Sequence, residues 1–290
     1  MEMGKRTIGV VGAGTMGGGI AQLAAERGFQ VLLYDVDHSQ LDKAVKQIGS
    51  FLERNVQKGR MSVAEKETAL SRIQTTTDPD QFGQADVVIE AVVEKMDVKK
   101  EVFARLDRVA RPETIFATNT SSLSITELAE ATTRQDRFAG MHFFNPAPVM
   151  KLVEVVRGLK TSDPTVEALM ALARELGKEP IEVKKDSPGF IVNRVMIPQF
   201  IEAIRLVEEG VATPEDVDKA VRLGLNYPMG PFELQDFAGV DIGLYVMDYF
   251  YQEFRDDRFA APLSLRRLVR AGRLGRKTGA GWYDYETQDK

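Results

Sequence analysis

The first part of the chain alternates short apolar runs with longer segments in which apolar residues recur at helical spacing. The runs are rich in aliphatic residues, as is typical of parallel strands that are buried on both faces. They lie at residues 8–11, 31–34, 86–93 and 114–119, with further candidates at 73–76, 137–146, 151–156 and 180–183. Two helical patterns, at 41–56 and 62–72, fall in succession after the second run. The alternation predicts an α/β fold with a mostly parallel sheet and one helical-pair insertion.

The pattern changes near residue 186. After Lys185 the strand-like runs stop, and apolar residues recur only at helical spacing. Asp186-Ser187-Pro188 has the composition of a capped helix start with proline in the first turn, and a long apolar helix is expected from about residue 189 to 209. We therefore predict an α/β domain over residues 1–186 and an all-helical domain over 187–290.

A glycine-rich turn directly follows the first predicted strand. It reads Gly12-Ala13-Gly14-Thr15-Met16-Gly17, and a helix-forming segment follows it. In this spacing the first glycine makes a sharp turn, the second lets backbone approach a pyrophosphate, and the third lets the helix pack closely on the strand. The unpaired N–H groups of the new helix point at the phosphates. Strand, turn and helix together predict a Rossmann unit that binds a dinucleotide.

Asp35 ends the second apolar run, 23 residues after Gly12. A carboxylate there accepts hydrogen bonds from the adenosine ribose, and its charge repels the 2′-phosphate of NADP, so NAD is the expected cofactor. An aspartate at a strand end is also a common turn former. By the rule that ligands bind beyond the carboxyl ends of parallel strands, Glu94 and residues 119–122 should line the same cleft.

Composition narrows the function. The chain has 290 residues, a net charge of −5, no cysteine and only two histidines. Disulfides, thiolate metal sites and a cysteine nucleophile are therefore excluded, and no metal site is expected. An acidic chain is a poor partner for nucleic acid. No apolar run has the length of a membrane span, so we expect a cytoplasmic protein without a membrane partner.

His142 is the candidate acid–base. It ends an apolar strand beside the predicted cleft, and an imidazole with a pKa near neutral can take or give a hydroxyl proton as hydride moves. A lone histidine in such a place is also often a structural residue. Glu154 lies twelve residues later on the adjacent strand, and Asn119 and Ser121 follow a neighbouring strand. That grouping favours general acid–base catalysis with an orienting carboxylate.

Two surfaces are open to two interpretations each. Lys43, Lys46, Lys58 and Arg60 form a basic face in an acidic protein, which is either a solvated surface or a landing site for an anionic group on a substrate. The helices after residue 186 carry many apolar and aromatic residues, as in Tyr245 to Phe254. This surface predicts a homodimer through the C-terminal helices, unless it packs on the first domain.

Five segments, in this order along the chain, resemble the 3-hydroxyacyl-CoA dehydrogenase family. They are GAGTMG at 12–17, ATNTSSLSIT at 117–126, GMHFFNPAPVMKLVEVV at 140–156, DSPGFIVNRV at 186–195 and GRKTGAGWYDY at 275–285. The chain length is similar to that of bacterial members that act on 3-hydroxybutyryl-CoA. The resemblance implies an NAD-dependent oxidation of a 3-hydroxyacyl-CoA to the 3-ketoacyl-CoA, and the reverse reduction.

The resemblance also implies roles for individual residues. His142 is the catalytic acid–base with Glu154 as its partner, and Ser121 and Asn193 hold the substrate oxygen. Lys58 meets the phosphates of the CoA substrate. The implied NAD site comprises Gly12, Ala13, Gly14, Thr15, Met16, Gly17, Asp35, Glu94, Lys99, Asn119, Ser121, Asn145 and Lys277. The alternatives are a dehydrogenase of a free hydroxy acid such as L-gulonate, which needs no CoA site, and a non-catalytic dinucleotide-binding protein.

Overall fold

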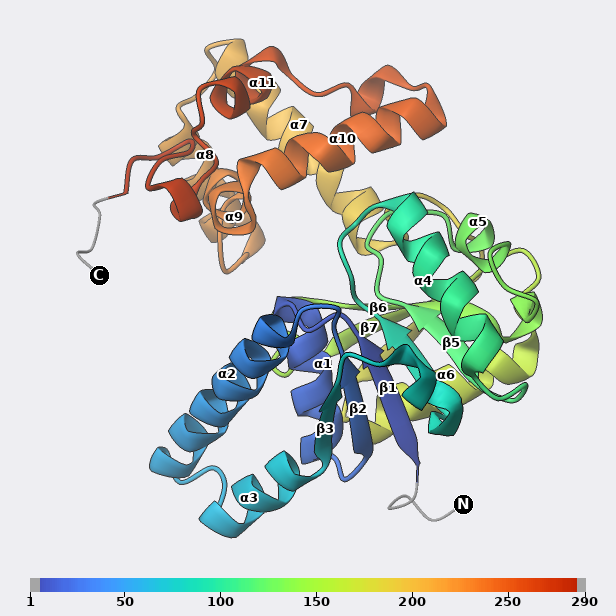
Figure 1. Ribbon diagram of the computed structural model, residues 1–290. Coiled ribbons are helices and arrows are strands. Elements are labelled where there is room, and N and C mark those ends of the chain that lie inside the picture. Colours follow the sequence, from blue (N-terminus) through green and yellow to red (C-terminus); the bar gives the residue numbers. More distant parts are fainter. Residues whose placement is uncertain (1–5, 286–290) are drawn as a thin grey trace. The chain divides into compact units, whose positions relative to one another are not determined.

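The computed structural model describes residues 6–285 (Figure 1). Contacts divide the chain into two compact units, Met1–Ser187 and Pro188–Lys290. The first contains the sheet, and the second is built from helices. Within the described residues, none of the helices combines the length and the apolar character needed to cross a bilayer.

The sheet of the first unit has eight strands in the order β3-β2-β1-β4-β5-β6-β7-β8. Neighbouring strands run parallel except β6 and β7, which run antiparallel, so the predicted mostly parallel sheet is confirmed. The strands are β1 Thr7–Val11, β2 Gln30–Tyr34, β3 Ile73–Thr76, β4 Val87–Glu90, β5 Ile115–Thr118, β6 Phe138–Phe143, β7 Leu152–Arg157 and β8 Glu179–Val183. The chain changes direction between β1 and β4, where doubly wound sheets bind their ligands.

Helices cover both faces of this sheet (Figure 1). α1 and α6 share one apolar core with the strands, whereas Phe103 of α4 packs on Phe116 and Phe138. The predicted helical pair, α2 and α3, lies between β2 and β3 in sequence and packs against α1. The helices of this unit are α1 Thr15–Glu26, α2 His38–Gln57, α3 Val63–Ser71, α4 Met96–Val109, α5 Ile125–Ala129 and α6 Asp163–Glu175, with short 3-10 turns η2 Pro79–Gln84 and η3 Gln135–Arg137.

The second unit surrounds an aromatic core that includes Phe200, Phe232, Phe250 and Phe259. Its elements are α7 Val192–Glu208, α8 Pro214–Leu225, α9 Pro231–Ala238, α10 Val240–Phe254 and α11 Leu263–Arg270, with 3-10 turns η4 Asp257–Phe259 and η5 Arg276–Thr278. The all-helical character predicted for this part is confirmed.

Two buried aspartates attach the last described segment to the second unit. Asp218 of α8 accepts hydrogen bonds from the Phe232 and Glu233 N–H groups and from the Tyr283 hydroxyl. Asp236 of α9 accepts from the Trp282 and Tyr283 N–H groups and from the Tyr285 hydroxyl. These bonds account structurally for the sequence GWYDY, whose aromatic residues have no helical periodicity.

Three predicted boundaries are wrong. The Asp186 helix cap does not form, because Gly189 and Phe190 have positive φ angles that a right-handed helix excludes, and α7 begins only at Val192. β4 ends at Glu90 rather than at residue 93, since the Val92 N–H donates to the Glu90 side chain instead of a neighbouring strand. α1 begins at Thr15, within the glycine turn, whereas the sequence analysis placed the helix-forming segment after Gly17 because glycines weaken helical propensity.

Candidate active site

The glycine turn between β1 and α1 has the geometry that its spacing predicts. Gly12 has a φ of +100°, and an ideal Cβ built on Gly17 would lie 1.7 Å from the Gly12 carbonyl oxygen. Both positions therefore require glycine. Nothing lies within 4 Å of an ideal Cβ on Gly14, so backbone is accessible at the N-terminus of α1. This arrangement fits a pyrophosphate.

Asp35 is held against the same turn. Its Oδ2 accepts from the Ala13 N–H at 2.8 Å, and its Oδ1 accepts from the Asp37 N–H at 3.0 Å. The second bond is the turn-forming interaction considered above, and the first ties the end of β2 to the glycine turn. The carboxylate thus lies at the nucleotide-binding edge while it also forms a turn.

His142 and Glu154 face each other across β6 and β7, where they are direct register partners. The His142 Nδ1 lies 2.7 Å from Glu154 Oε2, and the two residues are 5% and 0% exposed. The imidazole also packs against the Phe144 ring, with 4.4 Å between centroids. With the proton on Nδ1, this nitrogen donates to Glu154 and Nε2 is the acceptor of the ring.

Glu94 connects three of the other predicted residues. Its Oε1 accepts hydrogen bonds from the Ser121 N–H at 3.0 Å and from the Ser121 and Thr120 hydroxyls, and its Oε2 lies 3.2 Å from Lys99 Nζ. The loop after β4 and the loop after β5 are therefore joined at the carboxyl edge of the sheet. Glu94 and Ser121 come together as the strand-end rule predicts, and Lys99, which only the family resemblance implied, lies beside them.

Glu90 was missed by the sequence analysis, because it lies inside an apolar run. It is fully buried, and it accepts from Lys99 Nζ at 2.6 Å, from the Thr118 hydroxyl at 2.7 Å and from the Val92 N–H at 2.7 Å. Burial raises the pKa of Glu90, against the opposing attraction of the Lys99 ammonium. Lys99 is 1% exposed, and its ammonium lies between the carboxylates of Glu90 and Glu94.

Asn119 and Asn145 follow two neighbouring strands, β5 and β6. The Asn119 Oδ1 accepts from the Phe143 N–H at 2.8 Å, which joins the ends of β5 and β6 beside His142. Asn145 starts the loop that follows β6, and it is exposed.

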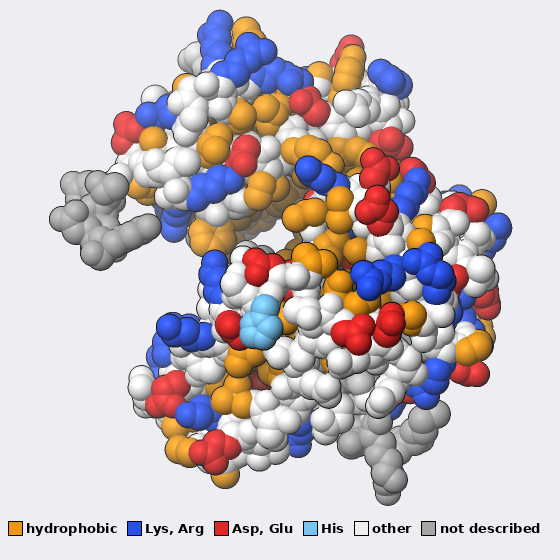
Figure 2. Space-filling view, in the orientation of Figure 1, with side chains coloured by type: hydrophobic (Ala, Val, Ile, Leu, Met, Phe, Trp, Pro, Cys, Tyr) orange, Lys and Arg blue, Asp and Glu red, His pale blue; other side chains and the backbone are white. Residues whose placement is uncertain are grey.

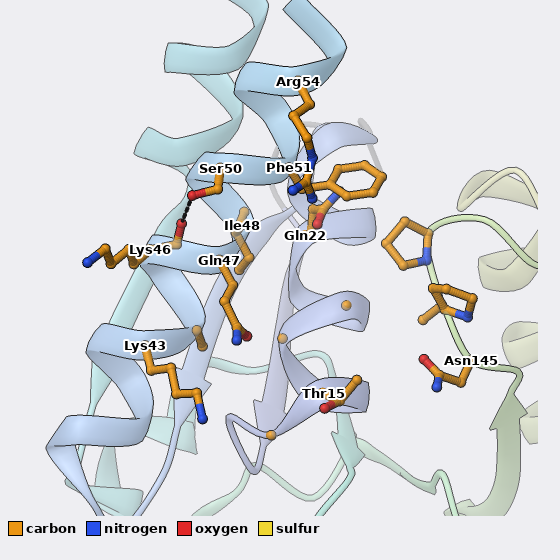
Figure 3. Close-up of a pocket in the computed structure, with 17 residues that line it drawn as sticks. Thr15, Gln22, Lys43, Lys46, Gln47, Ile48, Ser50, Phe51, Arg54 and Asn145 are labelled. Atoms are coloured by element: carbon orange, nitrogen blue, oxygen red, sulfur yellow. Dashed lines mark hydrogen bonds between the residues drawn. The ribbon is translucent and has the colours of Figure 1, made fainter. Parts of the chain in front are cut away.

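A cavity of about 610 Å³ opens between α1, α2 and this loop (Figure 3). Figure 3 shows Lys43 and Gln47 of α2 pointing toward α1, with Asn145 on the opposite wall. Arg54 lies over the Phe51 ring at the far end, 5.7 Å from its centroid. Figure 2 shows lysine and arginine side chains along α2, interspersed with acidic ones.

The predicted basic face contributes unequally to this cavity. Lys43 and Lys46 line it, whereas Lys58 and Arg60 do not, and Arg54 lines it although the sequence analysis did not single it out. Its helical position, three residues after Phe51, is the signal that could have identified it.

The remaining predicted residues, Asn193 and Lys277, belong to the second unit. Asn193 lies in the first turn of α7, and the Lys277 ammonium contacts both carboxylate oxygens of Asp241 at 2.6 and 2.8 Å. Among residues 6–285, no three His, Asp or Glu side chains gather as a metal site.

An apolar groove of about 740 Å³ lies within the second unit, between α7, α8 and the start of α9. Several of its lining residues are strongly exposed, including Val195 at 58% and Leu225 at 61%. Exposed apolar surface of this kind marks a site of association.

Two family models cover the chain. Residues 7–187 match the model described as "3-hydroxyacyl-CoA dehydrogenase, NAD binding domain", and residues 189–285 match "3-hydroxyacyl-CoA dehydrogenase, C-terminal domain". Similar proteins include the "Probable 3-hydroxybutyryl-CoA dehydrogenase" of Bacillus subtilis, 47% identical over 97% of this chain and 98% of that protein. The mitochondrial "Hydroxyacyl-coenzyme A dehydrogenase" of Homo sapiens is 48% identical over 96% of this chain and 91% of its own length.

Among solved structures, the (S)-3-hydroxybutyryl-CoA dehydrogenase of Ralstonia eutropha superposes with a TM-score of 0.95. It is 47% identical, and the alignment covers 97% of this chain and 99% of that one. Sequence and fold therefore agree over nearly the whole length.

Proposed function

This chain belongs to the 3-hydroxyacyl-CoA dehydrogenase family, and we propose that it oxidises the 3-hydroxyl of a short-chain (S)-3-hydroxyacyl-CoA with NAD and catalyses the reverse reduction. The observation that carries this proposal is the buried contact between His142 and Glu154 at the carboxyl edge of an NAD-binding sheet. The names of the Bacillus subtilis and Ralstonia eutropha relatives support a four-carbon acyl group.

NAD, when bound, supplies the acceptor for the hydride that leaves C3. The glycine turn from Gly12 to Gly17 would hold its pyrophosphate, and Asp35 its adenosine ribose, because open backbone N–H groups and a carboxylate lie where each is needed. Glu94, Lys99, Asn119, Ser121 and Asn145 would complete the site in the first unit, and Lys277 in the second.

The proton is handled by the histidine. His142 Nε2 takes the proton of the 3-hydroxyl, and Glu154 stabilises the imidazolium that results, since a carboxylate 2.7 Å from Nδ1 favours the charged ring. Ser121 and Asn193 donate to the substrate oxygen where negative charge develops. In the reverse direction the imidazolium returns the proton to the new alkoxide.

The CoA nucleotide would occupy the cavity between α1 and α2. Lys43 and Arg54 supply positive charge for its phosphates, and Phe51 offers a ring face for its base, whereas the Lys46 side chain extends away from the cavity (Figure 3). Lys58, at the exposed C-terminal end of α2, would contact a CoA phosphate that extends out of the cavity. None of these residues is part of the His142–Glu154 pair that handles the proton, so we expect them to determine binding rather than turnover.

The test is the rate of NADH oxidation with acetoacetyl-CoA, compared with free 3-oxo acids at equal concentration. We expect turnover of the thioester and none of the free acids. Preference for a free acid would instead favour a hydroxy-acid dehydrogenase, and NADH binding without turnover of any acyl-CoA would favour a non-catalytic protein.

We also propose a homodimer that forms through the C-terminal helices. The exposed apolar residues Val195, Leu225 and Tyr227 along the groove support it. Size-exclusion chromatography with light scattering should give twice the chain mass of 32.3 kDa, and a clean monomer would contradict the dimer. We propose the cytoplasm as its location, because NAD and acyl-CoA are highly charged molecules that do not cross membranes freely.

A further inference from the structure

Lys178 is a buried lysine that neither the predicted site nor the proposed mechanism uses. It lies between α6 and β8 and is 6% exposed. Its backbone is fixed, because its N–H donates to the Ala173 carbonyl at 2.9 Å and Gly177 before it adopts a φ of +75°. The backbone that carries the Lys178 side chain therefore has little conformational freedom.

The Lys178 ammonium binds backbone rather than an acid. Its Nζ donates to the Ala147 carbonyl at 2.6 Å and to the Met150 carbonyl at 2.8 Å. Burial lowers the pKa of Lys178 and the nearby Arg27 charge lowers it further, whereas the Glu26 charge opposes the shift. Burying a cation in this way is costly, and charge-assisted hydrogen bonds to two carbonyls offset that cost.

The two carbonyls belong to the loop that forms one wall of the nucleotide cavity. Residues 145–148 line the cavity, facing Phe51 and Arg54 of α2. The loop also lies close against α1 at the cavity wall, because an ideal Cβ on Gly19, which itself lines the cavity, would lie 3.3 Å from both Ala147 Cβ and Pro148 Cδ. Lys178 and Gly19 thus hold the loop from two directions.

We propose that Lys178 is a positioning residue that sets this loop and, through it, the width of the cavity for the nucleotide end of the acyl-CoA substrate. The proposal rests on the assignment of the cavity to the CoA nucleotide under the proposed function. Lys178 touches neither cofactor nor substrate, so its effect should fall on recognition of the nucleotide and spare proton transfer at His142.

The experiment compares two substrates that share the reacting group. Acetoacetyl-CoA carries the nucleotide, and acetoacetyl-pantetheine lacks it. At saturating NADH, we expect Lys178→Met to lower the ratio of kcat/KM for the CoA thioester to that for the pantetheine thioester about tenfold, because displacing a binding wall removes remote binding energy. The kcat for acetoacetyl-pantetheine should stay near the wild-type value. A general loss of folded enzyme would lower the apparent kcat/KM for both substrates by the same factor and would leave the ratio unchanged.

Lys160→Met is the matched control, since Lys160 is an exposed lysine of the same unit that pairs with Glu130. We expect it to keep the wild-type ratio. Gly19→Ala tests the loop independently of the lysine, because the added methyl forces the loop to give by a few tenths of an ångström. It should lower the same ratio, which would tie nucleotide recognition to this loop. If Lys178→Met does not fold, Lys178→Gln, which keeps a donor but not the charge, takes its place.

The outcomes separate the two proposals. If the wild-type enzyme has equal kcat/KM values for the two thioesters, the nucleotide does not bind in the cavity, and the proposed substrate site is wrong. Clear discrimination by the wild type, together with an unchanged ratio in a folded Lys178→Met or Lys178→Gln variant, would overturn the role of Lys178 alone.

Discussion

Two buried carboxylates, one in each unit, show how different the same group can be. Glu154 is fully buried in the sheet and faces the His142 imidazole, whereas Asp218 is 2% exposed and accepts from the Phe232 and Glu233 N–H groups and a tyrosine hydroxyl. Burial raises the pKa of Asp218, with the Tyr283 hydrogen bond opposing that rise.

The difference lies in the partner. An imidazole can gain and lose a proton near neutral pH, while a backbone N–H cannot and a tyrosine hydroxyl does so only in strong alkali. A carboxylate beside an imidazole can therefore stabilise a charge that appears during a reaction. A carboxylate beside fixed donors caps a helix and holds a segment in place. Burial alone does not separate catalytic from structural residues.

The strongest test of this comparison is the histidine. We expect His142→Gln to lower kcat by about 10²–10⁴-fold, since glutamine keeps a polar side chain but cannot exchange the proton. NADH affinity, measured by fluorescence titration, should stay near the wild-type value. Nearly unchanged turnover would remove His142 from the acid–base role.

The next test exchanges each carboxylate for its amide. Glu154→Gln should lower kcat about 10²-fold, because the amide no longer stabilises the imidazolium. Asp218→Asn should instead lower the free energy of unfolding by about 1–3 kcal/mol, since one oxygen cannot serve three donors. Steady-state kinetics and urea denaturation, both run on both variants, measure the two effects.

The comparison holds only if Glu154→Gln mainly lowers turnover and Asp218→Asn mainly lowers stability. A Glu154→Gln variant with full turnover, or an Asp218→Asn variant with wild-type stability, would show that the partner does not determine the role of the carboxylate.

The smallest expected effect is a titration in the second unit. Burial, together with the hydrogen bond to Asp236, raises the pKa of Tyr285 to about 12. The folded state thus favours the neutral hydroxyl, so the stability that Tyr285 contributes is present below about pH 10, the usual tyrosine pKa, and is lost as the pH rises toward 12. The phenolate absorbance of the wild type minus that of Tyr285→Phe should rise near pH 12. If the midpoint of this absorbance difference lies at the usual tyrosine pKa of about 10, the hydrogen bond between Tyr285 and Asp236 is contradicted.

The sequence predicted the elements whose signals are local. The signals of the glycine turn, the apolar strands and the helix predicted at 62–72 each lie within a few residues, and the structure confirms them, with a capping box of Ser62 and Glu65 at the start of α3. The contact between His142 and Glu154 was also within reach, because antiparallel strands joined by a short loop place residues twelve apart opposite each other.

The sequence did not reveal contacts between distant segments. Lys178 lies 31 residues from the carbonyl of Ala147, and Glu90 lies 28 residues from Thr118. Asp186 was predicted to cap a helix, yet it accepts from the Ser124 hydroxyl and the Thr126 N–H, both 60 or more residues away in sequence. Such partners depend on the packing of strands and helices, which the spacing along the chain does not encode.

The bond between Asn119 and the Phe143 N–H has a consequence for ligand chemistry. Because the carbamoyl oxygen is turned toward Phe143, the NH₂ group of the same planar amide projects the other way. This side chain can then only donate on its outer side, so a molecule that meets it must present a lone pair. The carboxamide oxygen of nicotinamide satisfies that polarity, and an N–H in the same place would be rejected.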